Sequence, residues 1–397
     1  MRAITDRPYD HEDGPSRTPV PTDKRTDIEA VRSKRRINMN DQNKTKVMVA
    51  MSGGVDSAVT ALLCIEAGYN AGGCTMKLYR PPTDDAAGRI CGSDKDVDDA
   101  RAICEHLGIS HTVLDFGARF EDTVISDFID EYQSCRTPNP CTVCNRCLKF
   151  GALLDAALDA GYDKIATGHY ARVEQAANGR YLLKRAADPT KDQTYFLWQL
   201  TQHQLSHTLF PLGSMTKAEA RAIAEQHGLV NAHKSDSQDI CFVPDGDYAA
   251  FIAKKTGANS PRGNFVDEEG RVLGLHAGII HYTVGQRKGL GIALGEPMYV
   301  KSKNMADNTV VLCRNDALFT SHLDADRINL IAVEHIDAHM RAEVKIRSAH
   351  KPAPATVTQT GPDSLHVEFD TPQRAIAPGQ SVVIYDGDVV IGGGIIK

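Results

Sequence analysis

The chain has 397 residues, of which 42% are hydrophobic, and this length suits roughly two to three packed domains. Its 45 lysines and arginines are outnumbered by 51 aspartates and glutamates, so no basic field over the whole molecule points to a polyanionic partner. Any contact with a nucleic acid must rest on local basic patches. No apolar run reaches the length of about 18 residues that a membrane span needs, so we expect a soluble protein without a membrane partner.

Residues 1–44 differ in composition from the rest of the chain, being rich in Asp, Arg, Lys, Pro and Thr and lacking apolar periodicity. Such a segment cannot bury enough apolar surface to fold, so we expect a disordered N-terminal extension. Its acidic residues argue against a mitochondrial transit peptide, and it lacks the apolar core of a secretory signal. We therefore expect a cytoplasmic protein, whose translation starts at Met1 or at Met39.

From residue 45 to residue 250, short apolar strands alternate with amphipathic helices. This alternation predicts an α/β domain with a doubly wound parallel sheet, whose ligands bind on loops at the carboxyl ends of the strands. The predicted strands cover residues 46–51, 71–76, 111–114 and 164–167. The predicted helices cover residues 57–67, 94–107, 120–132, 145–160 and 216–227, the last with a capping box of Thr216 and Glu219.

Beyond about residue 250 the pattern changes to short alternating runs separated by turn signals such as Asp386-Gly387. We expect a small mixed linker domain over residues 251–318. A C-terminal β-barrel-like domain is expected over residues 319–397.

The first predicted strand runs into the glycine turn Ser52-Gly53-Gly54-Val55-Asp56-Ser57, after which a helix begins at once. Two glycines allow a tight turn with bare amide groups, and the helix N-terminus adds partial positive charge, so the turn predicts a phosphate-binding cradle. It has neither the ending of a Walker loop nor the spacing of a dinucleotide site. The turn resembles the pyrophosphate-binding loop (PP-loop) of the ATP pyrophosphatase superfamily, whose members cleave ATP to AMP and pyrophosphate as they adenylate a substrate.

Ten cysteines are too few for a disulfide scaffold in a chain of this length, so they are core fillers, metal ligands or reactive thiols. Four of them lie on apolar faces of predicted elements, where inert buried thiols are expected: Cys64, Cys74, Cys104 and Cys313. Cys141, Cys144 and Cys147 instead share one short segment, a proline-rich loop just ahead of a predicted helix. A helix N-terminus favours the thiolate, which makes Cys144 a candidate nucleophile. Cys241 follows a polar, serine-containing segment, which favours a reactive thiol there too.

Together these segments resemble the bacterial tRNA-specific 2-thiouridylases, which replace the C2 oxygen of the wobble uridine of tRNA with sulfur. The resemblance extends over about residues 46–396 and includes several unrelated short motifs in order. These motifs are Ala166-Thr167-Gly168-His169-Tyr170, Lys191-Asp192-Gln193-Thr194-Tyr195-Phe196-Leu197, His281-Tyr282-Thr283-Val284-Gly285-Gln286-Arg287-Lys288-Gly289-Leu290 and Pro378-Gly379-Gln380.

The resemblance implies an enzyme, a tRNA-uridine 2-sulfurtransferase, that uses ATP with Mg²⁺ to adenylate the uridine oxygen and delivers sulfur from a persulfide on Cys241. Cys144 is the implied partner thiol, left in a disulfide with Cys241 until a reductant resets the enzyme. A sulfur-relay protein or a cysteine desulfurase is the implied sulfur donor. The implied ATP-binding residues are Ala50, Met51, Ser52, Gly53, Gly54, Val55, Asp56, Ser57, Met76 and Gly168. The implied tRNA-binding residues are Asn139, Pro140, Cys141, His169, Lys191, Asp192, Gln193, Arg347, Ser348 and Gln380.

Cys141 departs from the family pattern, which has an aspartate there, and Cys147 is also additional. The resulting Cys-x-x-Cys-x-x-Cys spacing is typical of metal ligands. Two interpretations therefore stand beside the persulfide relay: a [4Fe-4S] cluster on Cys141, Cys144 and Cys241 that binds the transferred sulfur, and a structural zinc. Another AMP-forming PP-loop enzyme acting on tRNA and a non-catalytic tRNA-binding protein are the alternative functions.

Overall fold

The computed structural model describes residues 45–79, 92–229, 240–243, 245–337 and 339–397, all within one folding unit, Gln42–Lys397. The disorder expected for residues 1–44 falls outside the described residues, as do Cys91 and the polar approach to Cys241 at 234–239. Among the helices that the structure describes, none is long and apolar enough to cross a membrane.

A parallel sheet of five strands forms the first layer, in the order β3-β2-β1-β4-β7. Helices cover both faces of this sheet. Alternate residues of β1 point to opposite faces and pack in different cores. Val47 and Val49 pack with α3, α4 and α10, whereas Met48 packs with η3 and α8. The predicted doubly wound sheet is therefore confirmed. The bounds are β1 Lys46–Ala50, β2 Asn70–Lys77, β3 His111–Asp115, β4 Lys164–Ala166, β7 Thr208–Leu209, α3 Val55–Glu66, α4 Asp94–Leu107, η3 Asn145–Ala152, α8 Leu153–Asp159 and α10 Lys217–Gln226.

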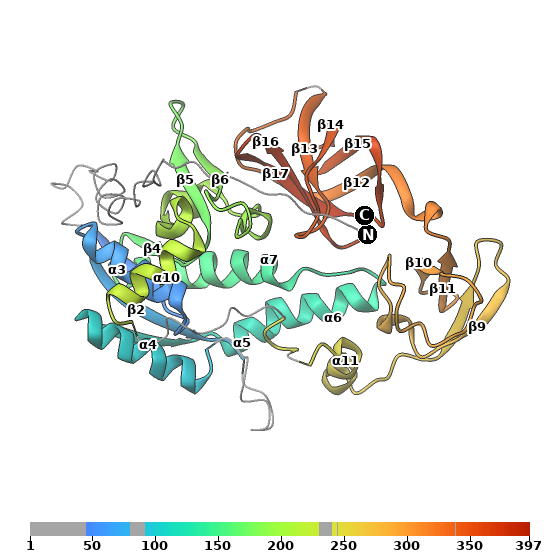
Figure 1. Ribbon diagram of the computed structural model, residues 1–397, viewed down its shortest axis with the longest axis horizontal. Helices are drawn as coiled ribbons and strands as arrows, with labels where there is room; N and C mark the ends of the chain where they lie inside the picture. The colour runs from blue at the N-terminus through green and yellow to red at the C-terminus, as the bar shows by residue number, and fades with distance from the viewer. Residues whose placement is uncertain (1–44, 80–91, 230–239, 244, 338) are drawn as a thin grey trace, which may run out of the picture. The chain divides into compact units, whose positions relative to one another are not determined.

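Two helical stretches lie between β3 and β4 (Figure 1). The first consists of α5 Gly117–Phe120, η2 Glu121–Ile125 and α6 Ser126–Gln133, and the second of α7 Pro140–Cys144 followed by η3 and α8. The second helix was expected to begin at Asn145, which is wrong. It begins at Pro140, because proline is well tolerated in a first helical turn, where its missing N–H is not needed. The three clustered cysteines therefore lie on a helix and not in a loop.

The middle of the chain forms a sheet in the order β10-β11-β8-β9, with one helix, α11 Tyr248–Thr256. The strands are β8 Gly263–Val266, β9 Val272–His276, β10 Tyr299–Asn304 and β11 Thr309–Cys313. Short elements elsewhere are η4 Thr194–Phe196, α9 Gln202–Ser206, η5 Pro211–Ser214, η6 Ile279–His281 and η7 Asp316–Leu318.

The last part of the chain is a β-barrel, which β12 and β17 close by pairing with each other. The expected barrel-like fold is confirmed. Its strands are β12 Phe319–Leu330, β13 Met340–Lys345, β14 Ala353–Gly361, β15 Ser364–Arg374, β16 Ser381–Asp386 and β17 Val389–Ile396.

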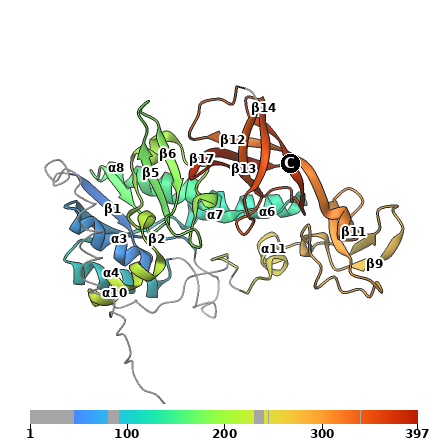
Figure 2. The same ribbon diagram turned by 45° about the horizontal axis from the view of Figure 1, so that its top comes forward.

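A hairpin that the sequence pattern did not reveal, β5 Ala171–Gln175 with β6 Tyr181–Arg185, extends the barrel sheet (Figure 2). β6 pairs with β17, so two strands that precede the barrel by more than a hundred residues become part of its sheet. Next to this junction Trp198, the only tryptophan of the chain, is fully buried in a core that also contains Tyr385 of β16.

The substitution Gly393→Ala tests how tightly the barrel packs on this core. A Cβ at Gly393 would lie 2.9 Å from the Trp198 ring and 2.5 Å from the carbonyl oxygen of Val382. We expect the overpacking to lower the free energy of unfolding by about 1–3 kcal/mol, measured by urea denaturation followed through Trp198 fluorescence. Val389→Ala, in the same strand at a half-buried position, is the control and should cost less. An unchanged midpoint for Gly393→Ala would contradict the tight packing.

Candidate active site

The predicted phosphate loop connects β1 to α3 where the strand order of the sheet reverses, since β1 has β2 on one side and β4 on the other. Ligands of doubly wound sheets bind at this crevice. Helix α3 has no side-chain cap at its N-cap residue Gly54, and a helix start without one suits the binding of a phosphate.

The loop keeps its shape through its own serines and a glycine. The Ser57 hydroxyl donates to the carbonyl of Gly54 at 2.9 Å and accepts from the amide of Ser52 at 3.2 Å. Gly53 has a φ of +67°, and a Cβ there would lie 2.7 Å from the carbonyl oxygen of Asp96 on α4. Both the left-handed backbone and this close approach require glycine.

Asp56 of the loop forms an ion pair that the sequence analysis missed. The Lys217 ammonium donates to both Asp56 carboxylate oxygens, at 2.8 and 2.7 Å, and the Tyr170 hydroxyl donates to one of them at 3.0 Å. Lys217 is 7% exposed and is the first residue of α10, directly after Thr216, whose predicted capping box with Glu219 is confirmed. The capping signal located this helix start, but no local pattern showed that its lysine reaches a residue 161 positions away.

The two residues expected near the adenosine lie on strands that flank β1. Met76 is on β2, in register with Leu114 of β3. Gly168 follows β4, and a Cβ on it would lie 2.9 Å from the Cβ of Asp56. The structure thus brings the expected ATP-binding residues to one edge of the sheet.

Cys144 and Cys241, 97 positions apart in the sequence, pack against the same hydrophobic core. Cys144 is 8% exposed, Cys147 and Cys241 are half-buried, and Cys141, on the same helix, is exposed. This core also contains Leu78, just after β2, so it continues to the side of the sheet where the phosphate loop lies.

Phe242 anchors the segment that carries Cys241. It is 3% exposed, and its ring centroid lies 5.5 Å from that of Phe120, 5.1 Å from that of Phe128 and 5.3 Å from that of Phe251. Such edge-to-face and tilted aromatic contacts add to the hydrophobic burial. Phe242 thereby holds the residue next to it against the helical stretch that precedes α7.

In the part of the chain that the structure describes, no three His, Cys, Asp or Glu side chains are arranged to hold a metal ion. Cys141, Cys144, Cys147 and Cys241 do not form such a group among the described residues.

The four cysteines expected to be structural are all buried, which confirms that interpretation. Burial raises the pKa of Cys64 and of Cys74 to about 12 and that of Cys104 to about 11, and it also raises the pKa of Cys313. Since the thiolate is the reactive form, these residues are poor nucleophiles at neutral pH.

Three residues expected to contact tRNA have partners inside the protein. Burial lowers the pKa of His169, which packs against Phe150 and Phe210, so its imidazole is neutral at physiological pH. Asp192 accepts from the Thr194 hydroxyl at 2.8 Å, and Gln193 accepts from the amide of Tyr170 at 2.9 Å. The side chains of Asp192 and Gln193 therefore build the turn that supports Tyr170 and, through it, Asp56.

Gln380, a further expected tRNA contact, holds the proline loop ahead of the cysteines. Its side-chain amide donates to the carbonyls of Thr137 at 3.0 Å and Pro138 at 3.3 Å, and the amide of Thr137 donates to the carbonyl of Pro378 at 2.7 Å. The barrel thus contacts the loop that contains Asn139 and leads into Pro140 and Cys141.

Arg347 lines a groove of about 620 Å³ on the barrel, together with His350 and Lys351. Its neighbour Ser348 and the half-buried Lys191 are the remaining expected tRNA contacts. The groove places two fixed positive charges on one surface, as a phosphate backbone requires.

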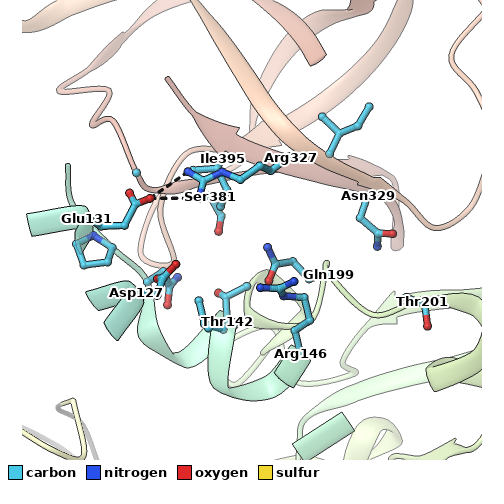
Figure 3. A pocket seen from close by; sticks show the side chains of 15 residues that line it. Asp127, Glu131, Thr142, Arg146, Gln199, Thr201, Arg327, Asn329, Ser381 and Ile395 are labelled. Carbon is cyan, nitrogen blue, oxygen red and sulfur yellow. Dashed lines mark hydrogen bonds and ion pairs between the residues drawn. The ribbon is translucent and has the colours of Figure 1, made fainter. Parts of the chain in front are cut away.

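A second cavity, of about 310 Å³, lies between α7 and the barrel (Figure 3). Its helical lining includes Asn139, Thr142, Val143 and Arg146, which recur at helical spacing along one face. Cys144 and Leu148, in contrast, belong to the aromatic-rich core that holds Cys241. Neither Cys144 nor Cys241 lines the cavity.

Comparison with known protein families places three models along the chain. Residues 45–245 match the tRNA methyl transferase HUP domain, residues 249–314 the tRNA methyl transferase PRC-barrel domain, and residues 320–396 the aminomethyltransferase beta-barrel domain.

Curated relatives match nearly the whole length. The tRNA-specific 2-thiouridylase MnmA of Lachnoclostridium phytofermentans is 50% identical over 88% of this chain and 99% of its own, and that of Clostridioides difficile is 48% identical over 89% of this chain and 98% of its own. Among solved structures, the U34-tRNA thiolase NcsA from Methanococcus maripaludis with its [4Fe-4S] cluster is 21% identical, covering 57% of this chain and 73% of its own. Its TM-score of 0.34 is too low to carry an argument.

Thiol labelling tests the division of the cysteines. At pH 7 a thiol with a pKa near 12 is ionised to only about one part in 10⁵, so Cys64 and Cys74 should stay unmodified in the native protein, while the exposed Cys141 reacts with a maleimide. Mass spectrometry of peptides after timed labelling measures each rate, and the unfolded chain is the control, in which all should react. Equal native rates for Cys64 and Cys141 would contradict the structure.

Lys217→Met should weaken both the fold and ATP binding. The substitution removes the counter-charge of the Asp56 carboxylate and leaves it the hydrogen bond from the Tyr170 hydroxyl. We expect the free energy of unfolding to fall by about 1–3 kcal/mol, a moderate loss because water still reaches the Asp56 carboxylate. Denaturant unfolding and ATP titration measure the two effects. Tyr170→Phe, which removes one hydrogen bond to the same carboxylate, should cost about 1 kcal/mol. Equal effects of the two substitutions would show that the charge of Lys217 does not matter.

Proposed function

Because the chain belongs to the tRNA-specific 2-thiouridylase family, we propose that it uses ATP to activate the wobble uridine of tRNA and replaces the C2 oxygen of that base with sulfur. It is a PP-loop enzyme of the tRNA-uridine 2-sulfurtransferase class. The proposal includes tRNA as the substrate, ATP with Mg²⁺, and a sulfur-relay protein or cysteine desulfurase as the sulfur donor. It also includes the cytoplasm as the location of the protein and the division of the chain at about residues 250 and 318.

The observation that carries the proposal is the shared core of Cys144 and Cys241 beside the phosphate loop. A sulfur carrier and a partner thiol must approach the same base, and that base must approach the α-phosphate of ATP. The core holds both cysteines, and it extends past Leu78 to the side of the sheet that ends in the phosphate loop.

The first step is adenylation. The uridine O2 attacks the α-phosphate of ATP, pyrophosphate leaves, and the poor leaving oxygen becomes a phosphate ester. Residues 50–57 hold the phosphates, and Met76 and Gly168 lie by the adenosine. Lys217, which pairs with Asp56 of this loop, is a further residue of the proposed phosphate site.

The second step is sulfur transfer. The terminal sulfur of a Cys241 persulfide attacks C2, the C–O bond breaks, and AMP leaves with the oxygen. Cys144 as a thiolate then attacks the Sγ of Cys241. The bond between this Sγ and the sulfur now attached to C2 breaks, and 2-thiouridine is released. Cys144 and Cys241 end as a disulfide, and an external dithiol reduces it by two electrons.

We place the tRNA on the barrel groove lined by Arg347 and Lys351, next to Ser348. Asn139, Pro140 and Cys141 then lie toward the target base. The exposed Arg287 and Lys288 are further proposed contacts to the tRNA phosphates. The remaining proposed tRNA residues are His169, Lys191, Asp192, Gln193 and Gln380. Of these, the neutral His169 and the internally hydrogen-bonded Asp192, Gln193 and Gln380 act by shaping the site.

The test is thiolation of unmodified tRNA with ATP and a persulfide donor, followed by digestion to nucleosides and mass spectrometry. We expect 2-thiouridine, and a loss of about a thousandfold or more for Cys241→Ser and for Cys144→Ser. Cys147→Ser, on η3 of the same helical stretch, is the matched control and should keep most of the activity. tRNA binding without 2-thiouridine would overturn the proposal.

The same preparation decides between the persulfide and cluster routes. Protein purified without oxygen should contain no stoichiometric iron or acid-labile sulfide. Stoichiometric iron that is lost in Cys141→Ser, with loss of thiolation, would establish the cluster instead.

A further inference from the structure

A half-buried carboxylate, that of Glu131 on α6, helps to hold the loop that leads into the cysteine helix. This side chain is 14% exposed and accepts from Arg136 Nε at 2.7 Å and from both terminal nitrogens of Arg327 at 3.2 Å. Arg136 lies in the loop before α7, and Arg327 lies on barrel strand β12. Arg136 also donates to the carbonyl of Ile396 at 3.1 Å, at the end of barrel strand β17.

Unusual backbone conformations gather around the same carboxylate. Cys135, next to Arg136, has a φ of 60°, and Arg327 has a φ of 50°, both in the left-handed region that side-chain-bearing residues rarely adopt. Gly379 has a φ of +90°, and a Cβ on it would lie 2.9 Å from the Glu131 carboxylate and 2.7 Å from the amide of Thr137. Such conformations persist only where surrounding contacts fix them, and they concentrate at functional sites.

The cavity of Figure 3 borders this ion pair. Asp127, Glu131 and Arg327 line it, together with Thr142 on the cysteine helix and Ser381 on β16. The hydroxyls of Thr142 and Ser381 are buried and find no hydrogen-bond partner within the described chain. Part of the interface between helix and barrel is therefore a cavity, and the ion pairs of Glu131 join the two beside it, together with the contacts of Gln380 and Pro378 to the same loop.

We propose that Glu131 is a positioning residue, which ties the cysteine helix to the C-terminal barrel and so fixes Cys144 for the sulfur step. The inference rests on the proposed function, because it assigns Glu131 a purpose in that reaction. Both of its arginine partners act through the carboxylate, and neither Glu131 nor Arg327 belongs to the ATP site or to the pair of thiols.

The test variant is Glu131→Gln, which keeps the shape but removes the charge. Its matched control is Glu343→Gln, since Glu343 of β13 also joins the barrel to the preceding domain, through Arg185 of β6 at 3.3 Å, but away from the cysteine loop. For Glu131→Gln we expect the single-turnover rate of thiolation to fall roughly tenfold or more, because small misplacements of a reacting group cost rate steeply. The KM for ATP should stay within about twofold, as should both values in the control.

A second readout needs neither ATP nor tRNA. The alkylation rate of the buried Cys144 should rise about fivefold in Glu131→Gln, since a loosened helix opens locally more often, and should not change in Glu343→Gln. Arg327→Gln should reproduce both effects, and the double variant should add little to either single one, as expected for residues that act as a unit.

Unchanged thiolation and unchanged Cys144 alkylation in a folded Glu131→Gln protein would overturn the inference. So would a parallel loss of ATP affinity, because that would indicate general damage to the fold. If wild-type protein makes no 2-thiouridine, the proposed function fails, and the alkylation rates still decide whether Glu131 positions the helix.

Discussion

The packing of Phe242 among the aromatic rings of three helices is the contact on which the site depends. Phe120 and Phe128 come from the helical stretch after β3, and Phe251 comes from α11. Phe242 packs against all three rings from its own segment of the chain. Val243, 1% exposed in the same core, holds the segment of Cys241 together with Phe242. Burial of apolar rings thereby brings two distant thiols into one hydrophobic environment.

Much of the fold could be predicted because its signals are local. Alternating strands and helices, glycines at a tight turn and a capping box each act within a few residues, and the sheet, the phosphate loop and the start of α10 follow from them. The structure departs from prediction where distant parts meet. The ion pair of Lys217 with Asp56 and the pairing of β6 with β17 join positions that no periodicity connects.

The site shows the same division. The identity of the candidate thiols followed from the chemistry of residues near a helix start, but the start itself was misplaced by a few residues because Pro140 opens the helix. Several residues that the family resemblance marks for tRNA are engaged within the protein. Asp192, Gln193 and Gln380 use their polar groups to hold turns and loops in place. Residues of a ligand-binding motif can thus contribute by holding the turns and loops that form the binding surface, and not only by contacting the ligand.

The hairpin β5–β6 has a consequence for how this protein can be divided. It precedes the barrel in sequence yet extends the barrel sheet, and the carbonyl of Asp388 in the β16–β17 turn accepts from the amide of Arg185 at 2.7 Å. A barrel expressed alone would expose the edge of β17, and an α/β fragment would carry an unpartnered hairpin. The two parts are interleaved, so a graft of the barrel onto a related enzyme has to carry this hairpin with it.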